Sequence, residues 1–180
     1  MELERVEFAI GKVEVGLTKY LNLMAQVHKV DVSKDKEFQK RYNGFYKMRQ
    51  RKPEFYKDYY EFMEVHKNKD VTYGEVLIYF YEKFGRIEAS FSSKLLATIN
   101  PNMPVWDEFV LMNLNLKKPT NNTKNRFSKT VELYTQINIW YDEFLASNES
   151  KVLLALFNKK YPNANITDVK KIDLILWQMR

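Results

Sequence analysis

The chain has 180 residues, a formal net charge of +6 and an isoelectric point near 9.2. Its length is that of about one domain, and 45% hydrophobic residues are typical of a folded globular protein rather than a disordered chain. The absence of cysteine excludes disulfides, thiolate metal ligands and cysteine nucleophiles, and the two histidines, His28 and His66, have no ligand spacing that predicts a metal site.

Helical periodicity begins at the N-terminal end of the chain. Residues 3–27 place apolar side chains at three- and four-residue steps, although two glycines weaken this helix. Residues 34–50 predict a second, basic helix, which Pro53 limits. Proline is favoured in the first turn of a helix, so a third helix is expected over 53–66.

In the middle of the chain, specific capping and breaking residues mark the helix boundaries. Thr72 followed by Glu75 is a capping box that opens a fourth helix, and Gly85 ends it. A fifth helix begins near Glu88 and stops before Pro101, because a residue that precedes proline is pushed out of the helical region.

Four further helices are expected, over 105–115, 124–146 and 148–161 and after a Thr167 cap, and no segment predicts a strand. Nine helices with short connections, and no Gly/Ser-rich linker between them, predict a single compact all-α domain over residues 1–180.

Cationic side chains gather in two segments of the sequence. Residues 40–57 contain one acid, Glu54, and aromatic residues alternate with the cations; no acid lies between Phe109 and Val131. Such segments are either solvated helix faces or phosphate-binding surfaces whose aromatic residues stack on bases. The residues that we expect to bind nucleic acid are Lys40, Arg41, Lys47, Arg49, Arg51, Lys52, Lys117, Lys118, Lys124, Arg126 and Lys129.

The stretch SFSSKLLATINPNMPVWDEFV, residues 90–110, contains the catalytic candidates. A helix, a short turn, a helix and then Pro-x-x-Asp resembles the core of the helix-hairpin-helix DNA glycosylase superfamily, over about residues 72–116. The resemblance implies a helical hairpin that grips the DNA backbone. It also implies that Asp107 acts as a general base or stabilises a sugar cation, with Lys94 as an amine nucleophile.

Asp107 has a second interpretation, as the cap of the helix expected over 105–115, where a carboxylate meets the helix dipole favourably. Two departures from the superfamily pattern favour the cap: no Gly-x-Gly precedes Lys94, and Trp106 stands directly before Asp107. We therefore assign no catalytic residue and keep Asp107 and Lys94 as candidates.

The C-terminal sequence ITDVKKIDLILWQMR looks like that of a widespread group of small bacterial proteins, many of them phage-linked. In size and in its lack of enzymatic motifs the chain is also similar to anti-CRISPR inhibitors. This resemblance implies a protein partner such as a CRISPR effector nuclease.

These observations predict a non-catalytic protein that contacts nucleic-acid phosphates through a basic surface. The alternatives are an inhibitor of a bacterial defence nuclease and a DNA base-excision glycosylase. No apolar run approaches the ~20 residues of a membrane span, and four glutamates near the start are unlike a signal peptide, so we expect a cytoplasmic protein without membrane contact. No motif indicates a cofactor, and the sequence leaves DNA, RNA and oligomeric state open.

Overall fold

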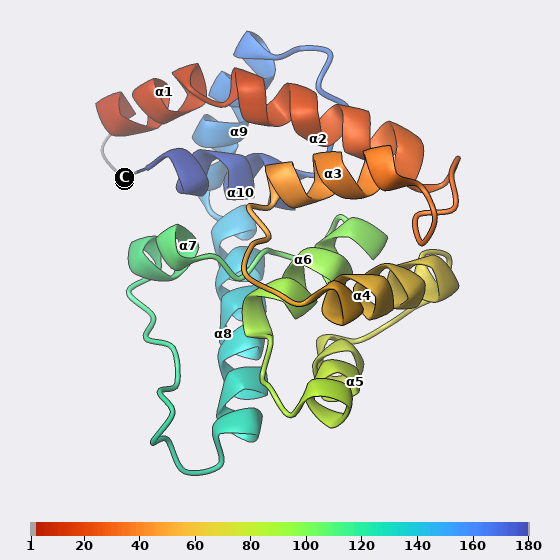
Figure 1. Ribbon diagram of the computed structural model, residues 1–180. Coiled ribbons are helices and arrows are strands. Elements are labelled where there is room, and N and C mark those ends of the chain that lie inside the picture. Colours follow the sequence, from red (N-terminus) through yellow and green to blue (C-terminus); the bar gives the residue numbers. More distant parts are fainter. Residues whose placement is uncertain (1–2, 180) are drawn as a thin grey trace.

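The computed structural model describes residues 3–179, and every regular element within this range is an α-helix (Figure 1). The ten helices of this range are α1 (Leu3–Gly11), α2 (Glu14–Val27), α3 (Lys36–Phe45), α4 (Pro53–His66), α5 (Tyr73–Phe84), α6 (Ala89–Ile99), α7 (Glu108–Asn113), α8 (Arg126–Ala146), α9 (Asn148–Lys160) and α10 (Asp168–Gln178). The all-α prediction is confirmed for this range.

Local capping chemistry explains several of the helix boundaries. Thr72 and Glu75 form the expected capping box at the start of α5, and Gly85 ends the helix in the left-handed conformation with φ of 64°. Thr167 caps α10 by accepting a hydrogen bond from the Lys170 amide. These three boundaries confirm the sequence prediction.

The single helix expected over 3–27 is wrong, because the chain breaks into α1 and α2 at Lys12 and Val13. The amides of these two residues donate to the carbonyls three positions back, to Ala9 at 2.9 Å and Ile10 at 3.2 Å. Glycine at position 11 lowers helix propensity, and the bend allows Val13 to be fully buried.

Two other predicted helices are too long. The helix expected over 34–50 ends at Phe45, because the chain turns through a left-handed Lys47 with φ of 52° and buries Met48. The helix expected over 105–115 is limited to α7, because the residues before Asp107 run extended into the core.

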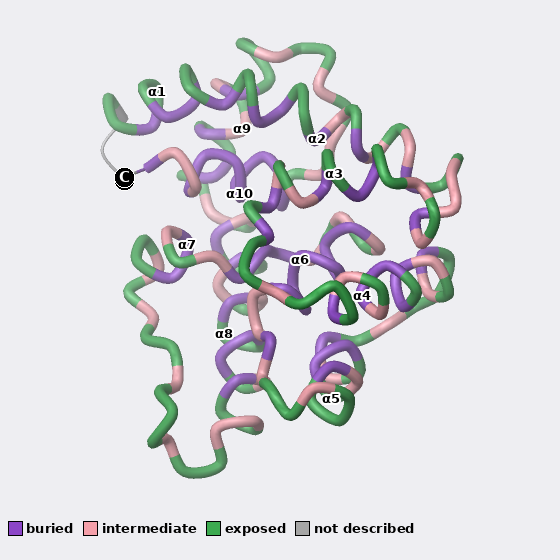
Figure 2. The backbone as a smooth tube through the Cα atoms, in the orientation of Figure 1, coloured by how far each residue is buried: buried purple, intermediate pink, exposed green. Residues whose placement is uncertain are grey.

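Buried apolar side chains form two clusters. Figure 2 shows along the backbone which residues are buried. One is built mostly from α1 and α7 to α10, and the other mostly from α2 to α6. Helix α6 lies between them, since Leu95 belongs to the second cluster and its neighbour Leu96 to the first. Most of α6 is buried, and it pairs with α5 through the turn at residues 85–88. The likeness of this hairpin to the glycosylase core stays a prediction.

Within residues 3–179, no helix combines the length and the apolar character that crossing a bilayer would require.

Candidate nucleic-acid interface

A basic cleft of about 560 Å³ lies between the loop that joins α3 to α4 and the loop that joins α7 to α8. The two loops are far apart in sequence, and Figure 1 shows the second as a long excursion between α7 and the start of α8. The fold therefore brings part of each cationic segment to one place. The cationic residues that line the cleft are Lys47, Arg49, Arg51, Lys94, Lys118 and Arg126, and its acids are Glu88, Asp107 and Glu108.

The cations of the cleft differ in how far their charge is already neutralised. Arg51 makes a two-pronged ion pair with the buried Glu88, with nitrogen to oxygen distances of 2.9 and 2.8 Å. Lys118 pairs with Glu108 at 2.8 Å, but both side chains are exposed, so water screens this pair.

Three further cations of the cleft, Lys47, Arg49 and Arg126, have no acidic partner among the described residues. These side chains are the ones that remain available to neutralise phosphates.

The other predicted nucleic-acid-binding residues lie outside the cleft. Arg41 on α3 donates to Gln26 at 3.3 Å, and Lys129 on α8 pairs with Glu132 at 2.6 Å. The cleft therefore gathers five of the eleven expected cations and adds Lys94. The residues outside it are Lys40, Arg41, Lys52, Lys117, Lys124 and Lys129.

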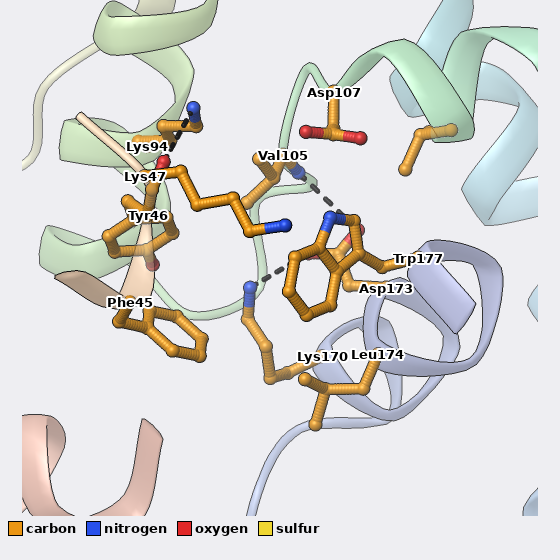
Figure 3. A pocket seen from close by; sticks show the side chains of 11 residues that line it. Phe45, Tyr46, Lys47, Lys94, Val105, Asp107, Lys170, Asp173, Leu174 and Trp177 are labelled. Atoms are coloured by element: carbon orange, nitrogen blue, oxygen red, sulfur yellow. Dashed lines mark hydrogen bonds and ion pairs between the residues drawn. The ribbon is translucent and has the colours of Figure 1, made fainter. Parts of the chain in front are cut away.

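A second cavity, of about 270 Å³, opens beside the cleft and is called here the aromatic pocket (Figure 3). It lies where the two apolar clusters meet, because Tyr46 comes from one and Leu174 from the other. The pocket and the cleft are adjacent, since both are lined by Lys47, Lys94 and Asp107. The remaining lining residues of the aromatic pocket are Phe45, Val105, Val110, Lys170, Asp173 and Trp177.

Lys94 projects from the buried helix α6 and is only 8% exposed. Its ammonium donates a hydrogen bond to the backbone carbonyl of Tyr46 at 3.0 Å. Burial lowers the pKa of Lys94; the charge of Asp107 opposes this shift, and the nearby Lys47 adds to it. A larger share of Lys94 is therefore a neutral amine at a given pH than of a lysine in water.

Asp107 begins helix α7, and its Oδ1 accepts a hydrogen bond from the Phe109 amide at 3.0 Å. The cap interpretation is confirmed. The same carboxylate also lines both the cleft and the pocket, without an ion pair to Lys94. Capping and a chemical role at the pocket are compatible, and the catalytic role stays a prediction.

The deepest polar group of the pocket is an ion pair on α10, between Lys170 Nζ and Asp173 Oδ2 at 2.8 Å (Figure 3). The side chains are 3% and 6% exposed. Asp173 also accepts hydrogen bonds from the Tyr141 hydroxyl and the Val105 amide. Burial is the largest single influence and lowers the pKa of Lys170, but Asp173 together with the Tyr46 and Tyr20 side chains outweighs it and raises that pKa, so Lys170 stays charged.

Sequence reasoning did not single out Lys170 and Asp173. A signal was present, because two opposite charges three residues apart interrupt the apolar residues of the last helix. The aromatic periodicity of the last helices leaves Trp177 open either to the core or to a stacking pocket; in the structure it is half-buried and lines the pocket, with the Lys47 ammonium 4.5 Å from its ring centre. Tyr134 and Tyr141 are buried in the core.

Among residues 3–179, no three histidine, cysteine, aspartate or glutamate side chains gather as a metal site would require. Comparison of the chain with family models, curated proteins and solved structures finds no match.

Proposed function

We propose that the protein binds the phosphate backbone of nucleic acid in the basic cleft. The observation that supports this proposal most strongly is the convergence of two distant cationic segments on one concave surface. Lys47, Arg49 and Arg126 offer unneutralised charge there, and each phosphate contact releases counterions from the nucleic acid. Phosphate contacts carry no direct sequence information, so we expect similar affinities across sequences.

A pair of matched double variants tests the cleft as the binding surface. Arg49→Ala with Arg126→Ala removes one free cation from each loop, whereas Lys40→Ala with Lys117→Ala removes the same charge outside the cleft. In fluorescence anisotropy with a labelled oligonucleotide of mixed sequence, we expect the cleft variant to bind on the order of tenfold or more weakly. Its salt slope should fall by about 2, since each phosphate contact contributes about 1.

The control variant should bind nearly as tightly as the wild type. An equal loss in both double variants would show that overall charge, and not the cleft, determines the binding.

A second candidate function, base excision from DNA, is favoured by one observation: Lys94 and Asp107 line the same pocket, and burial lowers the pKa of the Lys94 amine. In this reaction the neutral Lys94 amine attacks the sugar C1′ as the bond from C1′ to the base breaks, and the base leaves with the bonding electrons and takes up the proton that the amine loses. The C1′–O4′ bond of the sugar ring then breaks, O4′ takes up the second amine proton, and an imine between Lys94 and C1′ remains. The Asp107 carboxylate stabilises the positive charge that develops on the sugar.

This candidate has a direct chemical test. Borohydride reduction should trap a covalent complex between the wild-type protein and DNA that contains damaged or mismatched bases, and Lys94→Met should abolish it. Asp107→Asn should prevent base release while the melting temperature and DNA affinity stay nearly unchanged. If the wild-type protein releases no base from a representative set of such substrates, base excision is eliminated and cleft binding is unaffected.

A further inference from the structure

A third cavity, of about 210 Å³, adjoins the aromatic pocket at Phe45, Lys47 and Trp177. Two lysines near the junction of α1 and α2, Lys12 and Lys19, line it, and the sequence analysis assigned neither a role. Both are exposed and have no acidic partner among the described residues; the Lys12 ammonium lies 3.9 Å from the Phe8 ring centre. This cavity, called here the lysine groove, extends the cationic surface beyond both segments discussed above.

The cleft, the aromatic pocket and the lysine groove adjoin one another, and the three together are called here the path. The groove and the pocket are both lined by Phe45, Lys47 and Trp177, and Lys47 lines all three cavities. Trp177 therefore lines both the aromatic pocket, which adjoins the cleft with its arginines, and the groove that contains Lys12 and Lys19.

We propose that this path binds a single-stranded segment of nucleic acid, with one unpaired base stacked on Trp177 in the aromatic pocket. Phosphates on one side of that base contact Arg49 and Arg126, and phosphates on the other side contact Lys12 and Lys19. The inference rests on the proposed function, since it specifies the form of the nucleic acid that the cleft binds.

The chemistry of the pocket fits a base. Trp177 offers an aromatic face of the kind on which bases of any sequence stack. The Lys47 ammonium lies over this ring, 4.5 Å from its centre, so the flexible lysine side chain moves aside when a base stacks there. Beyond the ring, Lys170 has three N–H groups, and one of them donates to Asp173. A carbonyl oxygen or ring nitrogen of a base is an acceptor that matches the remaining groups.

The size of the pocket favours an unpaired strand over a duplex. A cavity of about 270 Å³ accommodates one base but not a base pair with its two backbones. A paired base would have to leave the stack before it reached Trp177, and that step costs free energy that a single strand does not spend.

The test compares one labelled oligonucleotide of mixed sequence, in deoxy and ribo forms, as a single strand and annealed to its complement. We expect the single strand to bind about tenfold more tightly than the duplex. Trp177→Ala should weaken single-strand binding by about tenfold and duplex binding little, whereas Trp177→Phe, which keeps an aromatic face, should restore most of the affinity.

The far end of the path is tested separately. Lys12→Ala with Lys19→Ala should weaken single-strand binding, and the matched control Lys29→Ala with Lys69→Ala, which removes exposed lysines outside all three cavities, should not. Equal affinity for single strand and duplex, or single-strand binding that survives Trp177→Ala, would overturn the inference. If either result is obtained while Arg49→Ala with Arg126→Ala still weakens binding, the proposed function of the cleft stands and only the single-strand inference is wrong. If neither the single strand nor the duplex binds in a salt-dependent manner, the inference and the proposed function are both wrong.

Discussion

Lys94 shows how burial alters the chemistry of a single residue. Its pKa is lowered in the folded protein, so the unfolded chain binds more protons than the folded one between that lowered value and the ordinary lysine value. Stability therefore rises with pH through this window, because the cost of burying the charge disappears as the amine loses its proton.

The first prediction follows from this increase of stability with pH. Relative to Lys94→Met, which keeps the length of the side chain without the charge, the wild-type protein should gain stability as the pH rises from 7 to 10. Urea denaturation of both proteins at the two pH values measures the difference in unfolding free energy. Lys29→Met, at an exposed position, should show no such change. A difference for Lys94→Met that stays constant or moves the other way would contradict the assigned pKa shift.

Asp107 carries the second prediction, because its cap hydrogen bond to the Phe109 amide is visible in the structure. Asp107→Ala should lower the unfolding free energy by roughly 0.5–2 kcal/mol, whereas Asp107→Asn should be mild, since asparagine caps about as well. Denaturant unfolding of the two variants measures the loss of unfolding free energy in each. Equal losses in both would mean that the charge of Asp107, and not its hydrogen bond, stabilises this region.

At the scale of elements, the turn between α5 and α6 depends on the backbone freedom of Gly85. Its φ of 64° is strained for any side chain with a Cβ, although an added Cβ would meet open space. Gly85→Ala should therefore destabilise the protein by about 1 kcal/mol. Gly74 lies within α5 without such a φ and also faces open space, so Gly74→Ala should stabilise by roughly 0.4–1 kcal/mol. Thermal unfolding of the two variants checks this prediction: the melting temperature should fall for Gly85→Ala and rise for Gly74→Ala, and a change in the same direction for both would contradict it.

The elements show which parts of the fold can be predicted from sequence. Helices α4 and α5 were predicted closely, because proline and the capping box act locally. The break between α1 and α2 and the early end of α3 were missed, because they depend on where Val13 and Met48 are buried, and burial is decided by distant parts of the chain.

In the candidate site, too, local features could be predicted from the sequence and features that depend on tertiary packing could not. Its cations could be named from charge patterns alone, but their convergence on one cleft depends on how the helices pack. Lys170 and Asp173 were overlooked because a buried ion pair inside an apolar helix has no periodicity that distinguishes it from a surface pair. Only the tertiary structure shows that the pair lines a pocket.

Across the whole molecule, three adjoining cavities are lined by cations from distant parts of the chain: the α1–α2 junction, α2, the loops α3–α4 and α7–α8, α6, α8 and α10. A positive field along a concave surface attracts a polyanion and orients it. The nuclease-inhibitor alternative, with a CRISPR effector nuclease as partner, stays a prediction, because no contact in the structure bears on it.

The dependence of nucleic-acid affinity on salt tests the central claim most directly. If the three cations of the cleft without an acidic partner each neutralise one phosphate, the binding constant measured by anisotropy should fall roughly 20- to 40-fold between 50 and 200 mM salt, linearly in a double-logarithmic plot. Absence of binding at 50 mM salt, or an affinity that does not change across this range, would contradict the account.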